Sequence, residues 1–164
     1  MAVEIVDGRE RSTALALAFE RHRDWLTRRL ALIVGDAEEA RDLVQETFVR
    51  AVEHGPLPGV DDEARWLATV GARLAIDERR RRRRWGFFPV RETDARWALE
   101  ADPDLWRALA RLDRRTRAAL VMTTLDGFTQ DEAAEAIGVP RGTIASWLAR
   151  ARPVLQAALA EDRP

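Results

Sequence analysis

The stretch FTQDEAAEAIGVPRGTIASWL, Phe128–Leu148, decides the fold of the C-terminal part of this chain. Thr129 is a natural N-cap, and Glu132, three positions later, is placed to complete a capping box. Gly138 can adopt the left-handed conformation that ends a helix, and Pro140 suits the first position of the next helix. The stretch therefore predicts two short helices joined by a sharp turn, the pattern that places a helix in a DNA groove.

The second helix of this pair has one apolar and one polar face. Ile144, Leu148 and Ala151 recur at helical spacing and are predicted to face the core. The arginines of this helix have no acidic residue among them, which favours contact with DNA over a solvated surface. The residues predicted to face outward are Arg141, Gly142, Ala145, Ser146, Ala149 and Arg150.

Length and composition bound the class of protein. The chain has 164 residues, 46% of them hydrophobic, enough for one ordinary domain or two small ones with real cores. It has no cysteine, which excludes disulfides and thiolate metal sites and fits a reducing cytosol. No segment is long and apolar enough to cross a bilayer, and no secretory leader is visible. We expect a soluble cytoplasmic protein with no membrane insertion.

The net charge is only −1, but the charges are unevenly distributed. Residues 36–63 hold nine acidic residues and two arginines, whereas residues 65–84 hold eight arginines and two acidic residues. A local excess of arginine attracts phosphate even when the whole chain is nearly neutral. One surface should therefore repel DNA and another attract it.

No segment shows the sustained alternation typical of a strand, so the predicted fold class is all-α. A first helix is predicted from about residue 11 to residue 34, with Gly35 ending it. Asp36 and Glu39 give a second capping-box signal for a helix that runs to about residue 52.

A third helix follows a loop rich in proline and glycine. Asp61 or Asp62 is predicted to cap it, and it should end in the arginine run at residues 79–84. Its buried side is expected to carry Trp66, Leu67, Val70 and Leu74.

The middle of the chain reads as a linker because glycine, proline and mixed charges interrupt the helical pattern. Helices from Asp104 and Asp113, the second closed by Gly127, then lead into the helix-turn-helix. We expect two small helical domains, residues 9–88 and 104–162, joined by a linker over residues 89–103. A proline inside a helix costs about 3 kcal/mol, so the last helix is expected to bend or end near Arg152, before Pro153.

Three stretches of the chain, in order, resemble the bacterial RNA polymerase sigma factors of the extracytoplasmic-function (ECF) group. Gly35–Phe48 resembles their second conserved region, Trp66–Asp77 resembles the helix that reads the promoter minus-ten element, and Leu109–Arg152 resembles their fourth region. The resemblance implies a subunit that binds core RNA polymerase, reads two spaced promoter elements and helps open DNA. It also implies, in many members, an inhibitory anti-sigma factor.

The resemblance assigns roles to three sets of residues. The set that grips core polymerase is Asp42, Leu43, Gln45, Glu46 and Arg50. The set that holds the opened strand of the minus-ten element is His54, Asp61, Arg65, Thr69, Arg73, Asp77 and Arg80. The set that reads the duplex at the minus-thirty-five element is Arg141, Gly142, Thr143, Ala145, Ser146, Arg150 and Arg152.

The chain departs from the family pattern at a few positions. The family often has Arg-Asn where this chain has Ala72 and Arg73, so Arg73 is expected to hold phosphate or a guanine in place of an asparagine contact. Ala145 and Trp147 stand where basic residues are usual, so affinity for DNA should depend more on the remaining arginines.

Nothing in the sequence predicts an enzyme. His22 and His54 have no partners at metal-ligand spacing, and there is no phosphate-binding glycine loop or nucleophile elbow, so we expect no catalytic residue, cofactor or metal. Two other functions remain open from the sequence. One is a stand-alone helix-turn-helix regulator, and the other is an interaction module that sequesters a regulator through its acidic second helix.

Overall fold

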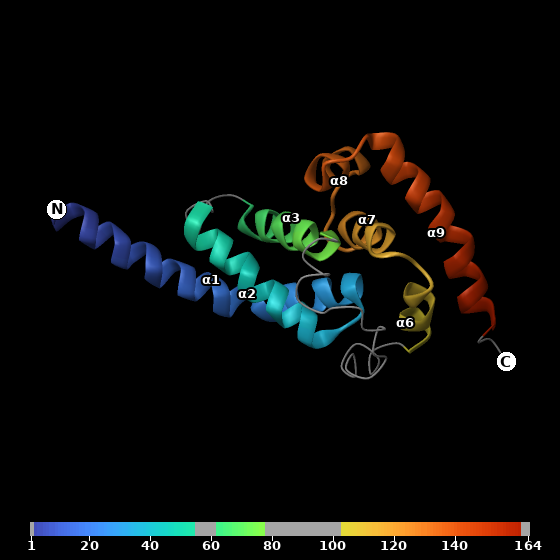
Figure 1. The fold of residues 1–164 in the computed structure, drawn as a ribbon, viewed down its shortest axis with the longest axis horizontal. Helices are drawn as coiled ribbons and strands as arrows, with labels where there is room; N and C mark the ends of the chain where they lie inside the picture. The colour runs from blue at the N-terminus through green and yellow to red at the C-terminus, as the bar shows by residue number, and fades with distance from the viewer. Residues whose placement is uncertain (1, 55–61, 78–102, 162–164) are drawn as a thin grey trace.

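The structure is a computed structural model that describes residues 2–54, 62–77 and 103–161. Every regular element within these ranges is an α-helix, which confirms the all-α fold class (Figure 1). The predicted linker at residues 89–103 lies outside the described ranges except for Pro103, which opens the helix that follows, and the arginine run at 79–84 lies outside them. The helices are α1 (Ala2–Val34), α2 (Ala37–His54), α3 (Glu63–Ile76), α6 (Pro103–Ala110), α7 (Arg114–Thr124), α8 (Gln130–Ile137) and α9 (Arg141–Glu161).

Helices α1 and α2 form an antiparallel hairpin. Gly35 makes the turn with φ of 82°, a conformation that a side chain would strain. The Asp36 carboxylate accepts a hydrogen bond from the Glu39 backbone N–H at 2.7 Å, so it caps α2 as predicted. Farther along the hairpin the rings of Phe19 and Phe48 meet edge to face, with centroids 5.0 Å apart.

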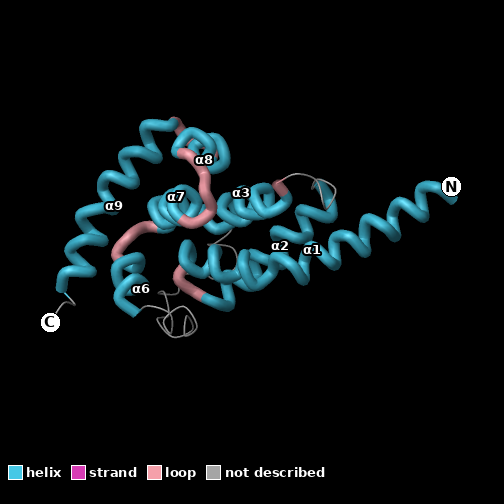
Figure 2. The backbone as a smooth tube through the Cα atoms, turned by 180° about the vertical axis from the view of Figure 1, so that it is seen from behind, coloured by secondary structure: helices cyan, strands magenta, loops and turns pink. Residues whose placement is uncertain are grey.

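Helix α1 begins earlier than predicted, at Ala2 instead of about residue 11. The added residues contain no proline, so nothing in them interrupts the helical hydrogen bonds. Both ribbon views show this N-terminal part of α1 projecting away from the other helices (Figures 1 and 2).

Helix α3 starts differently from the prediction. Asp62 occupies the N-cap position, but its backbone is left-handed, with φ of 78°, and its side chain makes no capping hydrogen bond. Its carboxylate lies 3.4 Å from Nε of Arg65 instead. Leu67 and Leu74 are buried as predicted, while Trp66 is partly buried against the same core.

The helix-turn-helix forms as its local signals predicted. The Thr129 hydroxyl accepts from the Glu132 backbone N–H at 3.2 Å, and the Glu132 carboxylate accepts from the Thr129 backbone N–H at 2.7 Å. Gly138 has φ of 80°. Helix α9 begins at Arg141, so Pro140 immediately precedes the helix instead of opening it.

We expected the last helix to bend or end near Arg152. Helix α9 continues through Pro153 to Glu161, so it does not end there. Val154 and Leu155, which follow the proline, pack with Leu109 and Leu112 beside α6. Burial of these side chains offsets the cost of the interrupted hydrogen bond.

The N-terminal and C-terminal helices share one hydrophobic core. Helices α7 and α8 pack against α3, and α7 also packs against α1 (Figure 2). Leu30 and Leu67 belong to the same buried cluster as Met122 and Phe128. The helix-turn-helix therefore lies directly on the helices that precede it in the chain.

Candidate nucleic-acid and partner interfaces

The polar face of α9 is open to solvent. Ile144 and Ala151, 0% and 1% exposed, hold the opposite face against the core. Thr143, at the start of the helix, is half-buried. The exposed residues of the polar face are Arg141, Gly142, Ala145, Ser146, Ala149, Arg150 and Arg152. The predicted outward face is thus confirmed as a surface, and Figure 1 shows α9 along one edge of the molecule.

Arg141 stands at the N-terminal end of this face, where the free backbone N–H groups of a helix favour anions. Its Nε lies 2.8 Å from the Asp131 carboxylate, and the two side chains are 72% and 62% exposed. A pair as open as this contributes little to stability. The Arg141 guanidinium can therefore exchange this partner for a phosphate or a base edge.

Helix α2 presents a polar surface away from the core. Gln45 and Arg50 are exposed, and Glu46 lies 3.5 Å from Arg50 one turn later. Leu43 is only 2% exposed and belongs to the core. The expectation that Leu43 contacts a partner directly is therefore corrected: it packs α2 onto its neighbours and holds the polar surface in place.

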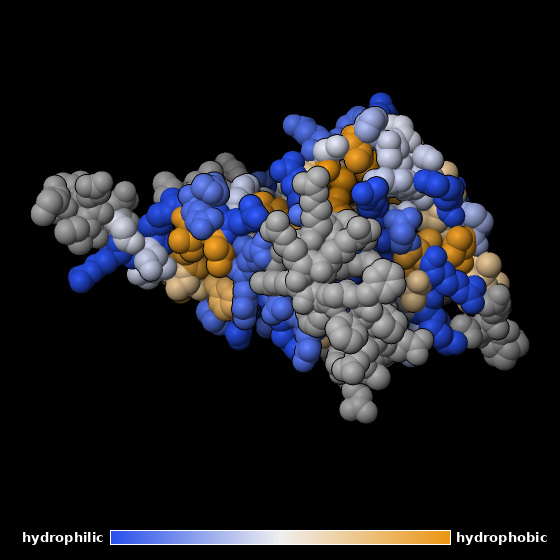
Figure 3. Space-filling model, viewed as in Figure 1, coloured by the Kyte–Doolittle hydropathy of each residue, from blue (hydrophilic) through white to orange (hydrophobic). Residues whose placement is uncertain are grey.

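Two exposed valines on α2 were not predicted from the sequence. Val49 and Val52 are 53% and 58% exposed. They follow Gln45 at i+4 and i+7, so they continue its face of the helix. Figure 3 shows apolar side chains gathered on the surface over this end of α2. Their helical spacing from Gln45 was the available signal.

A groove runs between α1 and α2 beside this surface. Its charged lining is mostly basic, with three arginines and one aspartate. The acidic excess of residues 36–63 in the sequence therefore does not make this side of the hairpin uniformly acidic. The lining residues are Phe19, Arg23, Asp24, Thr27, Arg28, Arg41, Val44 and Gln45.

Helix α3 carries the predicted strand-binding residues along one face. Arg65, Thr69 and Arg73 follow one another at intervals of four, which places them on the same side of the helix, whereas Asp77 is the C-cap residue after α3 and has an extended backbone. This face is not open along its length, since α8 packs against α3. His54 lies at the exposed end of α2, with its side chain 77% exposed. Asp61 and Arg80 lie outside the described residues.

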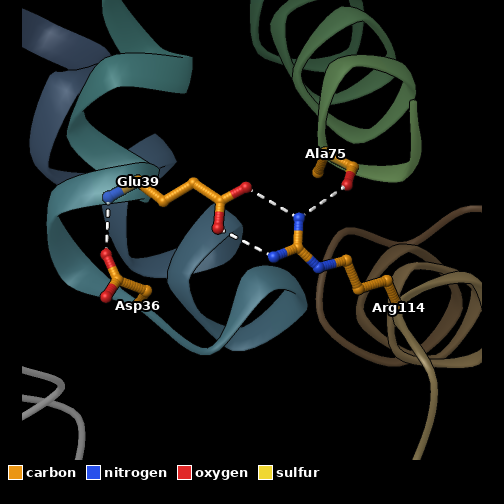
Figure 4. Close-up of polar contacts among 4 residues, drawn as sticks. All are labelled: Asp36, Glu39, Ala75 and Arg114. Carbon is orange, nitrogen blue, oxygen red and sulfur yellow. Dashed lines mark hydrogen bonds and ion pairs between the residues drawn. The ribbon is translucent and has the colours of Figure 1, made fainter. Parts of the chain in front are cut away.

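Arg114 joins three helices (Figure 4). Its two terminal nitrogens donate to the two carboxylate oxygens of Glu39, both at 2.7 Å, and one also donates to the Ala75 carbonyl at 3.4 Å. The Arg114 and Glu39 side chains are 15% and 14% exposed. Glu39 thus pairs across the molecule instead of completing the capping box predicted with Asp36.

A second ion pair joins α1 to the turn before α8. Arg29 Nε donates to the Asp126 carboxylate at 2.7 Å, and the Asp126 side chain is only 5% exposed. Burial raises the pKa of Asp126 above its ordinary value, while the hydrogen bond and charge of Arg29 oppose this rise. The carboxylate therefore depends on Arg29 for its charge.

Two protein families match this chain, one over its N-terminal part and the other over its C-terminal part. The family described as Sigma-70 region 2 matches residues 18–85, which include α3 and the whole of α2. The family described as Sigma-70, region 4 matches residues 103–153, which include the helix-turn-helix. The chain belongs to the sigma-70 family of RNA polymerase sigma factors.

Relatives place this sigma factor in the ECF group. The ECF RNA polymerase sigma factor SigL of Mycobacterium tuberculosis is 33% identical over 158 residues, which cover 87% of each chain. The ECF RNA polymerase sigma factor EcfG of Rhodopseudomonas palustris is 35% identical over 141 residues, covering 78% of this chain and 75% of EcfG.

Solved structures share the fold of this sigma factor. The sigma factor RpoE of Bartonella quintana, in complex with the anti-sigma factor NepR, superposes with a TM-score of 0.63 at 24% identity and covers 90% of this chain and 98% of RpoE. CnrH, in complex with the cytosolic domain of CnrY, also gives a TM-score of 0.63, at 23% identity, with 95% and 94% covered.

The function of this sigma factor follows from its family. It is a promoter-specificity subunit of RNA polymerase that recognises promoter elements in transcription initiation. The alternative of a stand-alone helix-turn-helix regulator is not favoured, because it leaves the match to region 2 unexplained. No helix in the described part of the chain has the length and apolar character to span a membrane.

Proposed function

We propose that this sigma factor binds core polymerase through α2, holds the opened minus-ten strand with α3, and reads the minus-thirty-five duplex with α9. The observation that carries the proposal is the open polar face of α9, where Arg141, Arg150 and Arg152 are exposed and no acidic residue stands between them in the sequence. The exposed surfaces of α2 and α9 belong to different helices of one chain, so a single subunit can meet the polymerase and DNA together.

At the minus-thirty-five element, α9 enters the major groove with its N-terminal end first. Arg141, Ser146 and Arg150 are exposed on the approaching face, and Arg152 extends it towards the phosphates. Arginine can contact a guanine with two hydrogen bonds, whereas contacts to phosphate fix register without reading sequence. Gly142 and Ala145 have no polar side chain and allow close approach, and Thr143 completes the set at the start of the helix.

At the core polymerase, the α2 surface combines charge with apolar area. Asp42, Gln45, Glu46 and Arg50 supply polar and charged groups. The exposed Val49 and Val52 add the kind of apolar centre that stable protein interfaces use. The proposed contact therefore includes both valines and excludes the buried Leu43.

At the minus-ten element, the arginines of α3 bind the strand backbone, as single-strand binding requires a basic track. Arg65, Thr69 and Arg73 form one row on α3, and Asp77 follows at its C-cap. His54, Asp61 and Arg80 flank this row in sequence and complete the proposed surface.

We further propose that this chain acts without covalent catalysis and in the cytoplasm, where polymerase and promoter DNA are found. An anti-sigma factor is also a proposed partner. RpoE and CnrH, which share this fold, were each solved with a partner, and the partner of RpoE is an anti-sigma factor.

The test is reconstituted transcription. Sigma-free core polymerase is mixed with the purified chain and a library of genomic fragments, and the 5′ ends of the transcripts are sequenced. The proposal requires transcripts that start at defined sites sharing two spaced motifs upstream, while core alone gives none of these starts. A stand-alone regulator would instead bind specific duplexes without polymerase and select no start sites.

A further inference from the structure

Arg65 of α3 contacts the N-terminal end of α8. A terminal nitrogen of Arg65 lies 2.6 Å from the Glu132 carboxylate, although the two atoms are not aligned as in a hydrogen bond. The Arg65 guanidinium also lies over the Phe128 ring, 3.9 Å from its centroid, which adds a cation–π attraction. The side chain of Arg65 is 27% exposed, so little of it is left for another ligand.

Arg73 holds the other end of α8. Its Nε donates to the Ala136 carbonyl, and its terminal nitrogen lies 3.4 Å from the Glu135 carbonyl. These carbonyls belong to the last turn of α8, where the helix supplies no partner and where a cation is favoured by the helix dipole. Arg73 thus caps α8 from a different part of the chain.

The length of the Arg73 side chain matters for this contact. An asparagine lacks the three methylene groups and the guanidinium fork through which Arg73 meets both carbonyls. The departure from the family pattern therefore has a structural role in this chain.

We propose that Arg65 and Arg73 form a latch by which α8 and the promoter strand compete for the same two guanidinium groups. This inference rests on the proposed role of α3 in strand binding. While α8 is docked, Arg65 is partly buried against Phe128 and Glu132, and Arg73, although exposed, donates to the end of α8. Both guanidiniums are therefore fully available to single-stranded DNA only in the fraction of molecules that have opened. The apparent affinity of the free chain is lowered by that fraction.

The absence of cysteine from the chain allows the test to use two introduced labels. Ser12→Cys on α1 and Gln156→Cys on α9, both exposed, receive spin labels for distance measurement on the full chain. The docking of α8 is weakened from its own side by Glu132→Gln, which removes the charge facing Arg65, with Asp126→Asn, which removes the charge facing Arg29 of α1. Both changes keep the side-chain shape, and the amide introduced at position 132 keeps an acceptor for the capping box. The matched control is Asp131→Asn with Asp24→Asn, which neutralises two exposed carboxylates near the same helices.

The expected result is a longer label separation in the latch variant than in the wild type and the control. The affinity of the latch variant, without polymerase, for a fluorescein-labelled mixed-sequence single-stranded oligonucleotide should rise at least about fivefold, the lower end of typical coupling between two sites. An unchanged separation, with native circular dichroism, overturns the latch. A longer separation with unchanged affinity overturns the competition. Start-site selection by the wild-type chain with core polymerase is measured separately. If the wild type selects no start sites, the proposed function is rejected instead.

Discussion

Arg114 and Glu39 face each other with two parallel hydrogen bonds of 2.7 Å, although they stand 75 positions apart in the chain. Arg114 is the first residue of α7, and Glu39 lies in the first turn of α2. Paired guanidinium and carboxylate forks are among the stronger hydrogen-bonded contacts in proteins. The pair therefore holds the first residue of α7 against the first turn of α2.

We expect Glu39→Gln to lower the free energy of unfolding by about 1–3 kcal/mol, because a charge-assisted hydrogen bond is lost at a mostly buried site. Urea unfolding followed by circular dichroism measures this change. In a double-mutant cycle with Arg114→Ala, contact predicts a coupling of about 0.5–3 kcal/mol. Strict additivity of the two changes would show that the pair contributes nothing.

Arg141→Ala should weaken discrimination at one minus-thirty-five base pair by about 1–3 kcal/mol, if the guanidinium makes a paired base contact. Reconstituted transcription on promoters varied at each position measures this preference. Asp131→Ala is the control, since it removes only the exposed partner of Arg141. Unchanged promoter preference in the Arg141 variant would reject a base-reading role.

Glu46→Arg should abolish association with core polymerase while leaving the fold intact. Its contact with Arg50 is an i,i+4 pair in which the Arg50 side chain is 51% exposed and the Glu46 side chain 23%, and pairs at this spacing contribute only about 0.3–0.5 kcal/mol. Co-purification with tagged core polymerase measures association. Glu10→Arg makes the same charge change on an exposed part of α1 and should bind normally. Retained binding by the Glu46 variant counts against the α2 surface.

Glycine substitutions should separate backbone strain from packing. Gly35 and Gly138 both have positive φ, but a Cβ at Gly35 would lie 3.1 Å from the Arg117 guanidinium, whereas a Cβ at Gly138 meets nothing within 4 Å. Gly138→Ala should therefore lower the free energy of unfolding by about 1–2 kcal/mol from backbone strain alone. Gly35→Ala should cost more, because Arg117 is buried. Thermal unfolding ranks the two variants, and equal losses would contradict the close approach.

The start of α8 should weaken in acid. Hydrogen bonds from Thr129 hold the pKa of Glu132 below its ordinary value of 4.5, and the charge of Arg65 adds to this effect. A carboxylate with a lowered pKa stabilises the folded state above its ordinary pKa, and this stability is lost as the pH falls through the lowered value. The loss should therefore begin as the pH falls through about 4.5 and continue below it.

Hydrogen exchange at the α8 amides, measured across this range, should show the loss in the wild type. Glu132→Gln should lack this step, because an amide side chain does not titrate. Asp126 titrates with the opposite sign: its pKa is raised by burial, so the cost of burying its charge applies at higher pH and falls away in acid. If the acid-induced loss of protection persists unchanged in the Glu132 variant, another titrating group causes it.

Local signals in the sequence were enough for most of the fold. Thr129, Glu132 and Gly138 act on neighbouring backbone groups, so their spacing alone predicted the helix-turn-helix. The course of α9 beyond Pro153 could not be predicted in this way, because packing against α6 maintains it. The same reason explains the burial of Leu43, which depends on neighbours from other helices.

The candidate surfaces were predictable to the extent that they follow helical periodicity. The outward face of α9 was predicted in full, and the row on α3 was predicted as a row. The contacts of Arg65, Arg73 and Glu39 join segments far apart in the chain. No spacing rule within one helix indicates such partners, so the occupation of the α3 arginines by α8 was found only in the structure.

Because the α3 arginines hold α8, a substitution at either position has two effects at once. If Arg73 has the roles proposed above, changing it would alter promoter choice. The same change would also alter the fraction of molecules in which α8 is undocked and the strand can bind. A change at Arg141, whose partner is the exposed Asp131, would alter only the α9 surface. New promoter preferences in this lineage would be expected to arise first at the minus-thirty-five element.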